Sequence, residues 1–308
     1  MMGLVSCASI FGSDADKNLS AFEPDLAGTG EPLAANAENG SSENAENSSG
    51  PHLVVGRLPS ALPTYLRNSF SKHVDVFGVQ ILGTDRVADD KLIHAATVMA
   101  EYLDNNEDGK VDNSLVLEAM LSNQATLVVF ANESDENNSS LFDFDINDGR
   151  IMQNLYAEEM VLAGNGSEGF DFSLEEILHL VSHAGYSFSH PEAFGEEPGS
   201  LIAEAMDLAR GGYFASVPNN YPSEAWYRYD DVTCEYDCQI AEYFYWALTS
   251  LLGAQSAEWR FDDISHEWLL NTPEKLENGD PTMFKLLTDP KYDMPSRLPD
   301  GNYAIAQD

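Results

Sequence analysis

The chain has 308 residues, with 15 Lys and Arg against 52 Asp and Glu, so its formal net charge is −37 and its isoelectric point is near 4.1. A surface this acidic repels phosphate backbones and anionic headgroups, which argues against partners such as nucleic acid and makes metal cations the natural partners. Hydrophobic residues form 43% of the chain, enough for a sizeable core. No apolar run approaches the ~18 residues of a membrane-spanning helix.

Residues 1–50 differ from the rest of the sequence. Leu4, Val5, Ser6 and Cys7 resemble the lipobox at which bacterial lipoprotein precursors are cut and acylated on the cysteine. A leader normally has ~15–30 residues with a basic start, so the resemblance implies a start codon upstream of Met1. Residues 18–50 carry few large apolar side chains, which predicts a disordered tether. We therefore expect an extracellular or cell-surface protein that touches a membrane only through a lipid; the alternative is a plain disordered tail.

Residues 51–308 are expected to form a single folded domain. Strand signals dominate the first half of this region and helical periodicity the second, which favours an α+β fold over a doubly wound parallel sheet. The patterns predict a helix at 62–72, a β run at 74–82, a helix at 89–103, a strand at 125–130, a polar loop at 132–147, a strand near 151–159, and helices at 174–184, 201–209 and 239–252.

An acidic loop at 104–115 follows the first long predicted helix. Its oxygen side chains alternate, and Gly109 stands where a sharp bend is needed, a pattern that converges on one hard cation. The loop resembles an EF-hand or thrombospondin-type calcium loop, although Leu115 replaces the bidentate Glu at position 12, which implies weak binding. The alternative is an acidic surface turn. The predicted calcium ligands are Asp104, Asn106, Asp108, Asp112 and the carbonyl oxygen of Lys110.

A second candidate metal site lies on the helix predicted within residues 173–186, where Ser173 and Glu176 suggest a capping box. His179 and His183 are four residues apart, a spacing that can chelate one ion from one helical face, as in H-E-x-x-H zinc sites. Glu204, on the next predicted helix, can supply a third ligand. The alternatives are that the histidines belong to the core, or that His190 is a ligand.

From His179 to Asp207 the sequence resembles the thermolysin-like gluzincin metallopeptidases. That resemblance implies a zincin-like fold, zinc bound by His179, His183 and Glu204, and Asp207 orienting a ligand histidine. The general base of the family follows the first histidine, where this chain has Leu180. Glu176 lies on the same helical face as both histidines and could act as the catalytic base, as a ligand, or as a hydrogen-bond acceptor for an imidazole.

The remaining cysteines, Cys234 and Cys238, form an even pair that predicts a disulfide; a thiolate metal site lacks a second Cys or His pair nearby. The aromatic residues 221–229 either hold substrate or pin a long connection to the core. His52, His73, His94 and His266 have no ligand-like companions and are expected to be structural. Motifs for serine hydrolases, P-loop NTPases and dinucleotide enzymes are absent.

These observations support two functions. The first is a zincin-like metalloprotein that hydrolyses peptide or protein substrates and has calcium as a structural brace. The second is a non-catalytic calcium-binding or adhesion protein, a pseudo-peptidase. Leu180 separates them, because Leu cannot polarise a metal-bound water.

Overall fold

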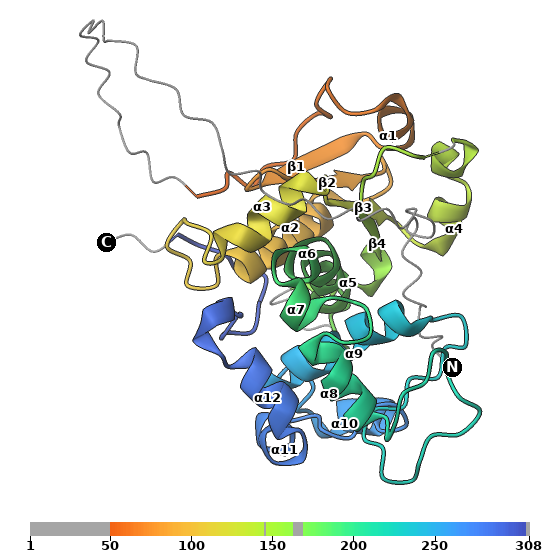
Figure 1. The fold of residues 1–308 in the computed structure, drawn as a ribbon. Helices are drawn as coiled ribbons and strands as arrows, with labels where there is room; N and C mark the ends of the chain where they lie inside the picture. Colours follow the sequence, from red (N-terminus) through yellow and green to blue (C-terminus); the bar gives the residue numbers. More distant parts are fainter. Residues whose placement is uncertain (1–49, 145, 163–168, 306–308) are drawn as a thin grey trace, which may run out of the picture.

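The computed structural model describes residues 50–144, 146–162 and 169–305. It confirms the α+β fold: a four-stranded sheet forms early in the chain and helices follow it (Figure 1). The strands lie in the order β1, β2, β3, β4, with β1 and β2 antiparallel and the other two neighbouring pairs parallel. Their bounds are β1 Lys72–Val76, β2 Val79–Gly83, β3 Thr126–Phe130 and β4 Met152–Tyr156. The predicted tether and Cys7 lie outside the described residues.

The first two strands form a hairpin where the sequence predicts one β run. Val76 pairs with Val79, so only Phe77 and Gly78 make the turn. Both have positive φ, +52° and +95°, the backbone of the two-residue turn that matches the twist of paired strands. A bulky residue seldom adopts positive φ, so Phe77 gives no sequence signal for a turn.

The sheet is buried on both faces. Val74, Ile81 and Val129 point to the larger core, which is shared with helices α2 (Asp89–Leu103), α3 (Ser114–Ser122) and α5 (Ser173–Val181). Leu82 and Val128, one position along their strands, point to a smaller core under α1 (Thr64–Ser69) and the 3-10 turn η1 (Ser140–Asp143). This alternation is the period-2 geometry of a strand.

The loop predicted at 132–147 also contains α4 (Glu133–Asn137), and the 3-10 turn η2 (Ala157–Glu159) follows β4. The chain after α5 is helical. Its elements are the π turn η3 (Ser182–Tyr186), α6 (Ser187–Ser189), α7 (Pro191–Phe194), α8 (Leu201–Ala209), α9 (Tyr236–Leu251), α10 (Glu258–Ile264), α11 (Pro273–Gly279), α12 (Pro281–Leu287) and the 3-10 turn η4 (Pro290–Tyr292). The larger apolar core runs without a break from β1 to Tyr292, so sheet and helices share it.

The two ends of the described chain meet beside the loop that follows α2 (Figure 1). Gly50 lies so close to Ile305 and Gly109 that a Cβ on it would meet Ile305 Cδ1 at 2.8 Å and Gly109 Cα at 3.0 Å. The C-terminal segment is also fixed to α2, because Glu101 accepts the amide hydrogens of Gly301 and Asn302 at 2.9 and 3.1 Å.

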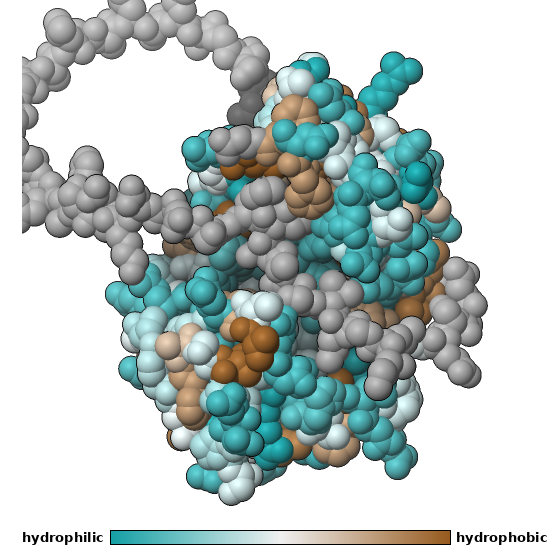
Figure 2. Space-filling view, turned by 90° about the vertical axis from the view of Figure 1, so that its right-hand side faces the viewer, coloured by the Kyte–Doolittle hydropathy of each residue, from teal (hydrophilic) through white to brown (hydrophobic). Residues whose placement is uncertain are grey.

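The face drawn in Figure 2 is largely hydrophilic, and its hydrophobic side chains appear as separate patches. Among the described residues no helix combines the length and the apolar character needed to cross a membrane.

Candidate metal centre

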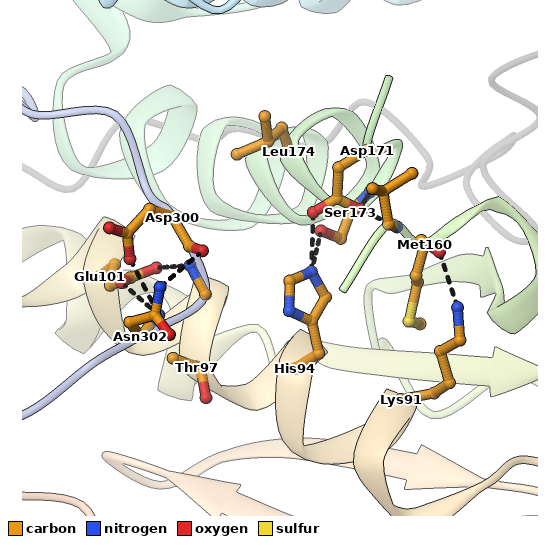
Figure 3. Close-up of polar contacts among 12 residues, drawn as sticks. Lys91, His94, Thr97, Glu101, Met160, Asp171, Ser173, Leu174, Asp300 and Asn302 are labelled. Atoms are coloured by element: carbon orange, nitrogen blue, oxygen red, sulfur yellow. Dashed lines mark hydrogen bonds and ion pairs between the residues drawn. The ribbon is translucent and has the colours of Figure 1, made fainter. Parts of the chain in front are cut away.

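Helix α5 is held at its start by a polar cluster with α2, drawn in Figure 3. Asp171 Oδ2 lies 2.7 Å from His94 Nε2, and Asp171 Oδ1 accepts the amide hydrogen of Ser173 at 3.2 Å. The predicted capping box is wrong: Phe172 is the N-cap and makes no side-chain cap bond. Asp171, one residue earlier, satisfies the first amide instead.

Ser173, His94 and Asp171 do not form a nucleophile relay. The Ser173 hydroxyl and the Asp171 carboxylate both meet the same atom, His94 Nε2, at 3.3 and 2.7 Å. A serine triad needs the base and its orienting carboxylate on different ring nitrogens. The cluster therefore anchors α5 to α2 (Figure 3).

The interior of the molecule brings together Glu175 and His179 of α5 and Glu242 of α9. Each offers one ligand atom, and the three atoms lie within 4.8 Å of one another. His179 Nε2 is 3.6 Å from Glu242 Oε1 and 4.0 Å from Glu175 Oε1. All three residues are buried, with exposed fractions of 8%, 1% and 1%. This is a group of acidic residues and histidine that can hold a metal ion.

Glu176 adds a further carboxylate next to this group. Its Oε2 accepts a hydrogen bond from Gln153 Nε2 of β4 at 2.5 Å, and the residue is buried. Burial raises the pKa of Glu176 well above its usual range; the charge of His179 lowers it, and the charges of Glu175 and Glu242 raise it. Glu176 therefore lies within the electrostatic reach of all three residues.

Burying several carboxylates together is unfavourable unless a cation compensates them. Glu175 Oε2 is inaccessible to solvent and has no hydrogen-bond partner in the described part of the chain. The buried cation Arg260 makes its hydrogen bonds to neutral groups. Its guanidinium donates to Tyr245 Oη at 3.2 Å and to Gln255 Oε1 at 2.8 Å. A divalent ion among Glu175, His179 and Glu242 would supply the missing charge. Two carboxylates and one imidazole suit Zn²⁺, Mn²⁺ or Fe²⁺.

The structure does not bring the three predicted zinc ligands together. His179, His183 and Glu204 are not among the groups of described residues whose ligand atoms converge within 4.8 Å. Instead, His183 Nδ1 contacts Glu196 Oε2, whose charge raises the pKa of His183, and Glu204 is exposed on α8.

His183 does not share a helical face with His179 because the helix type changes between them. The α-helix ends at Val181 and continues as the π turn Ser182–Tyr186, whose wider winding breaks the four-residue spacing of one face. The turn packs closely on α3, since a Cβ on Gly185 would meet Val116 Cγ1 at 2.7 Å.

Two other predicted site residues have different partners in the structure. Asp207 pairs with Arg210 at 2.7 Å and accepts the hydroxyl hydrogen of Tyr236 at 3.0 Å, which joins α8 to the start of α9. His190 is not in a ligand group of the described residues, and its ring packs against Tyr292 at 5.3 Å.

Sequence reasoning missed Glu175 and Glu242. Glu242 falls in the helix predicted at 239–252, and a carboxylate between Ala241 and Tyr243 in an apolar stretch is a signal, because an isolated buried charge needs a partner. Glu175 and His179 have the same i, i+4 spacing as the two predicted histidines.

The long connection before α9 reaches this interior group. Tyr229 Oη donates to Glu242 Oε1 at 3.1 Å, and the same residue lines a cavity of about 670 Å³ bordered by Tyr221, Arg228 and Asp230. Tyr227 anchors the connection through its hydroxyl, which donates to Gln239 O at 2.7 Å. The aromatic residues therefore pin the connection, and Tyr229 also links the cavity to the buried carboxylates.

A second group of possible ligands lies at this cavity. Ligand atoms of Asp230, His266 and Glu267 converge within 4.8 Å, with Asp230 and His266 exposed and Glu267 buried. His266, expected to be structural, is therefore placed with two carboxylates.

The predicted calcium loop makes many internal hydrogen bonds. Asp104 accepts the amide hydrogens of Asp108 and Gly109 at 3.1 and 2.8 Å and the hydroxyl hydrogen of Tyr303 at 2.5 Å. Asn106 and Asp108 accept further loop amides, from Asp108 and Lys110. Asp112 accepts the Asn105 amide at 2.7 Å, and burial and the charges of Asp104 and Asp108 raise the pKa of Asp112. The three aspartates are not among the convergent groups of described residues, so calcium binding stays a prediction.

The predicted bond between Cys234 and Cys238 is present, with the two Cα atoms 5.4 Å apart. It closes a short loop at the start of α9, and Cys238 lies one helical turn before Glu242.

Comparisons of the chain with protein-family models, curated proteins and solved structures find no match.

Proposed function

We propose that the protein is a metal-dependent hydrolase that cleaves amide bonds in peptide or protein substrates, with zinc bound by Glu175, His179 and Glu242. The observation that carries the proposal is the convergence of these three buried ligand atoms within 4.8 Å, beside a further buried carboxylate. The gluzincin resemblance is thereby kept as a proposal with a different ligand set.

Moving the ligand pair four residues toward the N-terminus removes the difficulty of Leu180. In H-E-x-x-H sites, the ligands stand at i and i+4 and the base at i+1. With Glu175 and His179 as the ligands, the residue at i+1 is Glu176. Leu180 then has no catalytic place, in agreement with its burial in the core at 1% exposure.

Glu176 is the proposed general base. Zinc would contribute Lewis acidity toward the carbonyl oxygen and toward water. Glu176 would accept a proton from the attacking water and pass it to the leaving amine, with Gln153 holding its carboxylate in place. Tyr229 would orient Glu242 through their 3.1 Å hydrogen bond, and the adjoining cavity would admit the substrate chain.

Two measurements on the purified protein test this proposal. Metal analysis of protein prepared without chelator should find about one zinc ion held by the interior group, and His179→Ala and Glu242→Gln should each lose it. Glu176→Gln should keep the ion and lower the hydrolysis of a fluorogenic peptide library by roughly 10²- to 10⁴-fold.

Two control variants change residues outside the interior group, in the π turn that continues α5 and in α8. His183→Ala and Glu204→Gln alter the ligands first predicted, and neither should change metal content or hydrolysis. The proposal fails if metal content is unaffected by His179→Ala, or if Glu176→Gln hydrolyses the peptides at the wild-type rate.

We also propose calcium in the Asp104 loop as a structural brace, and the cell surface as the location, with Cys7 as the lipid-modified residue. The loop supports the first because Asp104 joins it to Tyr303 of the C-terminal segment. In the non-catalytic alternative, a calcium-binding or adhesion protein, the calcium loop is functional and the interior group has no catalytic role. Peptide hydrolysis that depends on Glu176 separates the two functions.

A further inference from the structure

Two ligand-type side chains line the cavity beside Tyr229, and a third, from a buried residue, lies next to them; the proposed hydrolase site uses none of the three. We propose that Asp230, His266 and Glu267 form a second divalent-cation site, distinct from the interior group. Their ligand atoms lie within 4.8 Å of one another, and Asp230 and His266 also line the cavity.

Backbone pairing holds the two contributing segments together. Tyr227 and Trp268 form an isolated antiparallel bridge, and the Arg228 amide donates to Glu267 O at 2.7 Å. The Glu267 amide in turn donates to Ile264 O at 2.9 Å, at the end of α10. The three side chains are thus presented by ordered backbone on two segments that lie far apart in the sequence.

Glu267 supplies an independent observation, a buried carboxylate oxygen that is available to a cation. It is 2% exposed, and its Oε2 is buried without a hydrogen-bond partner in the described part of the chain. Its Oε1 lies 3.6 Å from His266 Nε2. The Arg228 guanidinium donates to the carbonyl oxygens of Ala225 and Ser223, and the ion-pair partner of Glu267 among the described residues is His266.

The two sites should differ in exchange rate. Asp230 and His266 are exposed, whereas Glu175, His179 and Glu242 are buried. An ion at the cavity wall can therefore leave without opening the core, while an ion in the interior cannot. The sites are also neighbours, because the charges of Glu242 and Glu175 act on Glu267. We expect the second ion to bind more weakly and to exchange with solution.

Equilibrium dialysis against micromolar Zn²⁺, with millimolar Ca²⁺ present to occupy the Asp104 loop, tests this inference. Wild type should bind two zinc ions, and one should be removed by gel filtration. Asp230→Asn and His266→Ala should each bind one ion, and Asp262→Asn, which changes an exposed carboxylate of α10, should bind two.

The readouts separate this inference from the proposed function. Zinc that is lost in His179→Ala but not in His266→Ala or Asp230→Asn overturns the second site and leaves the hydrolase proposal intact. The reverse pattern supports the second site and overturns the interior one. Both exposed variants replace surface side chains, and circular dichroism checks that they fold. Wild-type stoichiometry in Asp230→Asn and His266→Ala would end the inference.

Discussion

Two regions of this protein gather carboxylates, and they satisfy them in opposite ways. In the Asp104 loop the acidic oxygens accept backbone amide hydrogens, such as those of Asp108 and Gly109. In the interior group Glu175 has a buried oxygen with no hydrogen-bond partner in the described part of the chain, and Glu176 and Glu242 lie close to it.

The difference bears on which region depends on metal. In the loop, backbone N–H donors already stabilise the carboxylates, so an ion adds less. In the interior, side chains supply single donors to Glu176 and Glu242, and an ion would relieve more of the desolvation penalty of the buried charges. We therefore expect the folded interior to depend strongly on its metal ion and the Asp104 loop to depend only weakly on calcium.

The largest effect is expected from adding a carboxylate to the interior. Leu180→Glu would restore the gluzincin base at its usual place in the sequence, but Leu180 is 1% exposed in the core. The variant should lose about 4 kcal/mol or more of stability, because a buried charge without a partner is among the costliest changes. Urea unfolding measures this loss, with Leu180→Met, expected to cost under about 1.5 kcal/mol, as the control. A stable variant with new activity would contradict the ligand assignment.

Metal removal should come next in size. At zinc a thousandfold above its dissociation constant, binding to the folded state contributes about 4 kcal/mol, and a chelator removes that contribution. For a protein of this size the melting temperature should fall by roughly 10 °C. Differential scanning calorimetry should show this fall in wild type and in Asp108→Ala, but not in His179→Ala. An equal fall in melting temperature in His179→Ala would contradict the assignment of the metal to the interior group.

Glu101, which anchors the C-terminal segment beside the Asp104 loop, should make a smaller, pH-dependent contribution to stability. Burial raises the pKa of Glu101 to about 7, despite the amides of Gly301 and Asn302. The folded state then binds the extra proton between about pH 4.5 and 7, so stability falls as pH rises through this window. With solvent screening the change should be about 1–2 kcal/mol.

Melting curves from pH 5 to 8 test this sign. Glu101→Gln should lack this component of the pH dependence, whereas Glu118→Gln, at an exposed position of α3, should keep it. Parallel pH profiles of stability for Glu101→Gln and wild type would rule out this contribution of Glu101.

Calcium should give the smallest effect. At about ten times its dissociation constant, Ca²⁺ contributes about 1.4 kcal/mol, and without the Glu of position 12 that constant should be ~10⁻⁴ to 10⁻³ M. Millimolar Ca²⁺ should raise the melting temperature by a few degrees in wild type and leave Asp108→Ala unchanged. An identical rise in both proteins would place the effect elsewhere.

Local patterns predicted much of the fold. The helix at 89–103 has the predicted bounds, because Asp89 and Asp90 favour a helix start and the apolar periodicity ends at Leu103. The hairpin was missed because its turn relies on positive φ at Phe77, a conformation that the residue type does not signal.

The candidate site could be predicted only in part. His179 and Glu176 follow from the sequence of α5. The position of His183, in contact with Glu196, could not be predicted because the π turn at Ser182 depends on packing of Gly185 against α3, which is tertiary information. Glu242 lies 63 positions beyond His179, a separation that helical periodicity cannot bridge.

The meeting of the two ends of the described region has a topological consequence. Gly50 lies against Gly109, Tyr303 and Ile305, so a short linker could join Gly50 to Ile305 in a protein of residues 50–305 while new termini are opened elsewhere. Such a circular permutant would keep every contact of α5 and α9. Any anchor upstream of Gly50 would likewise apply force at the Asp104 loop, leaving the helices around Glu242 outside the line of tension.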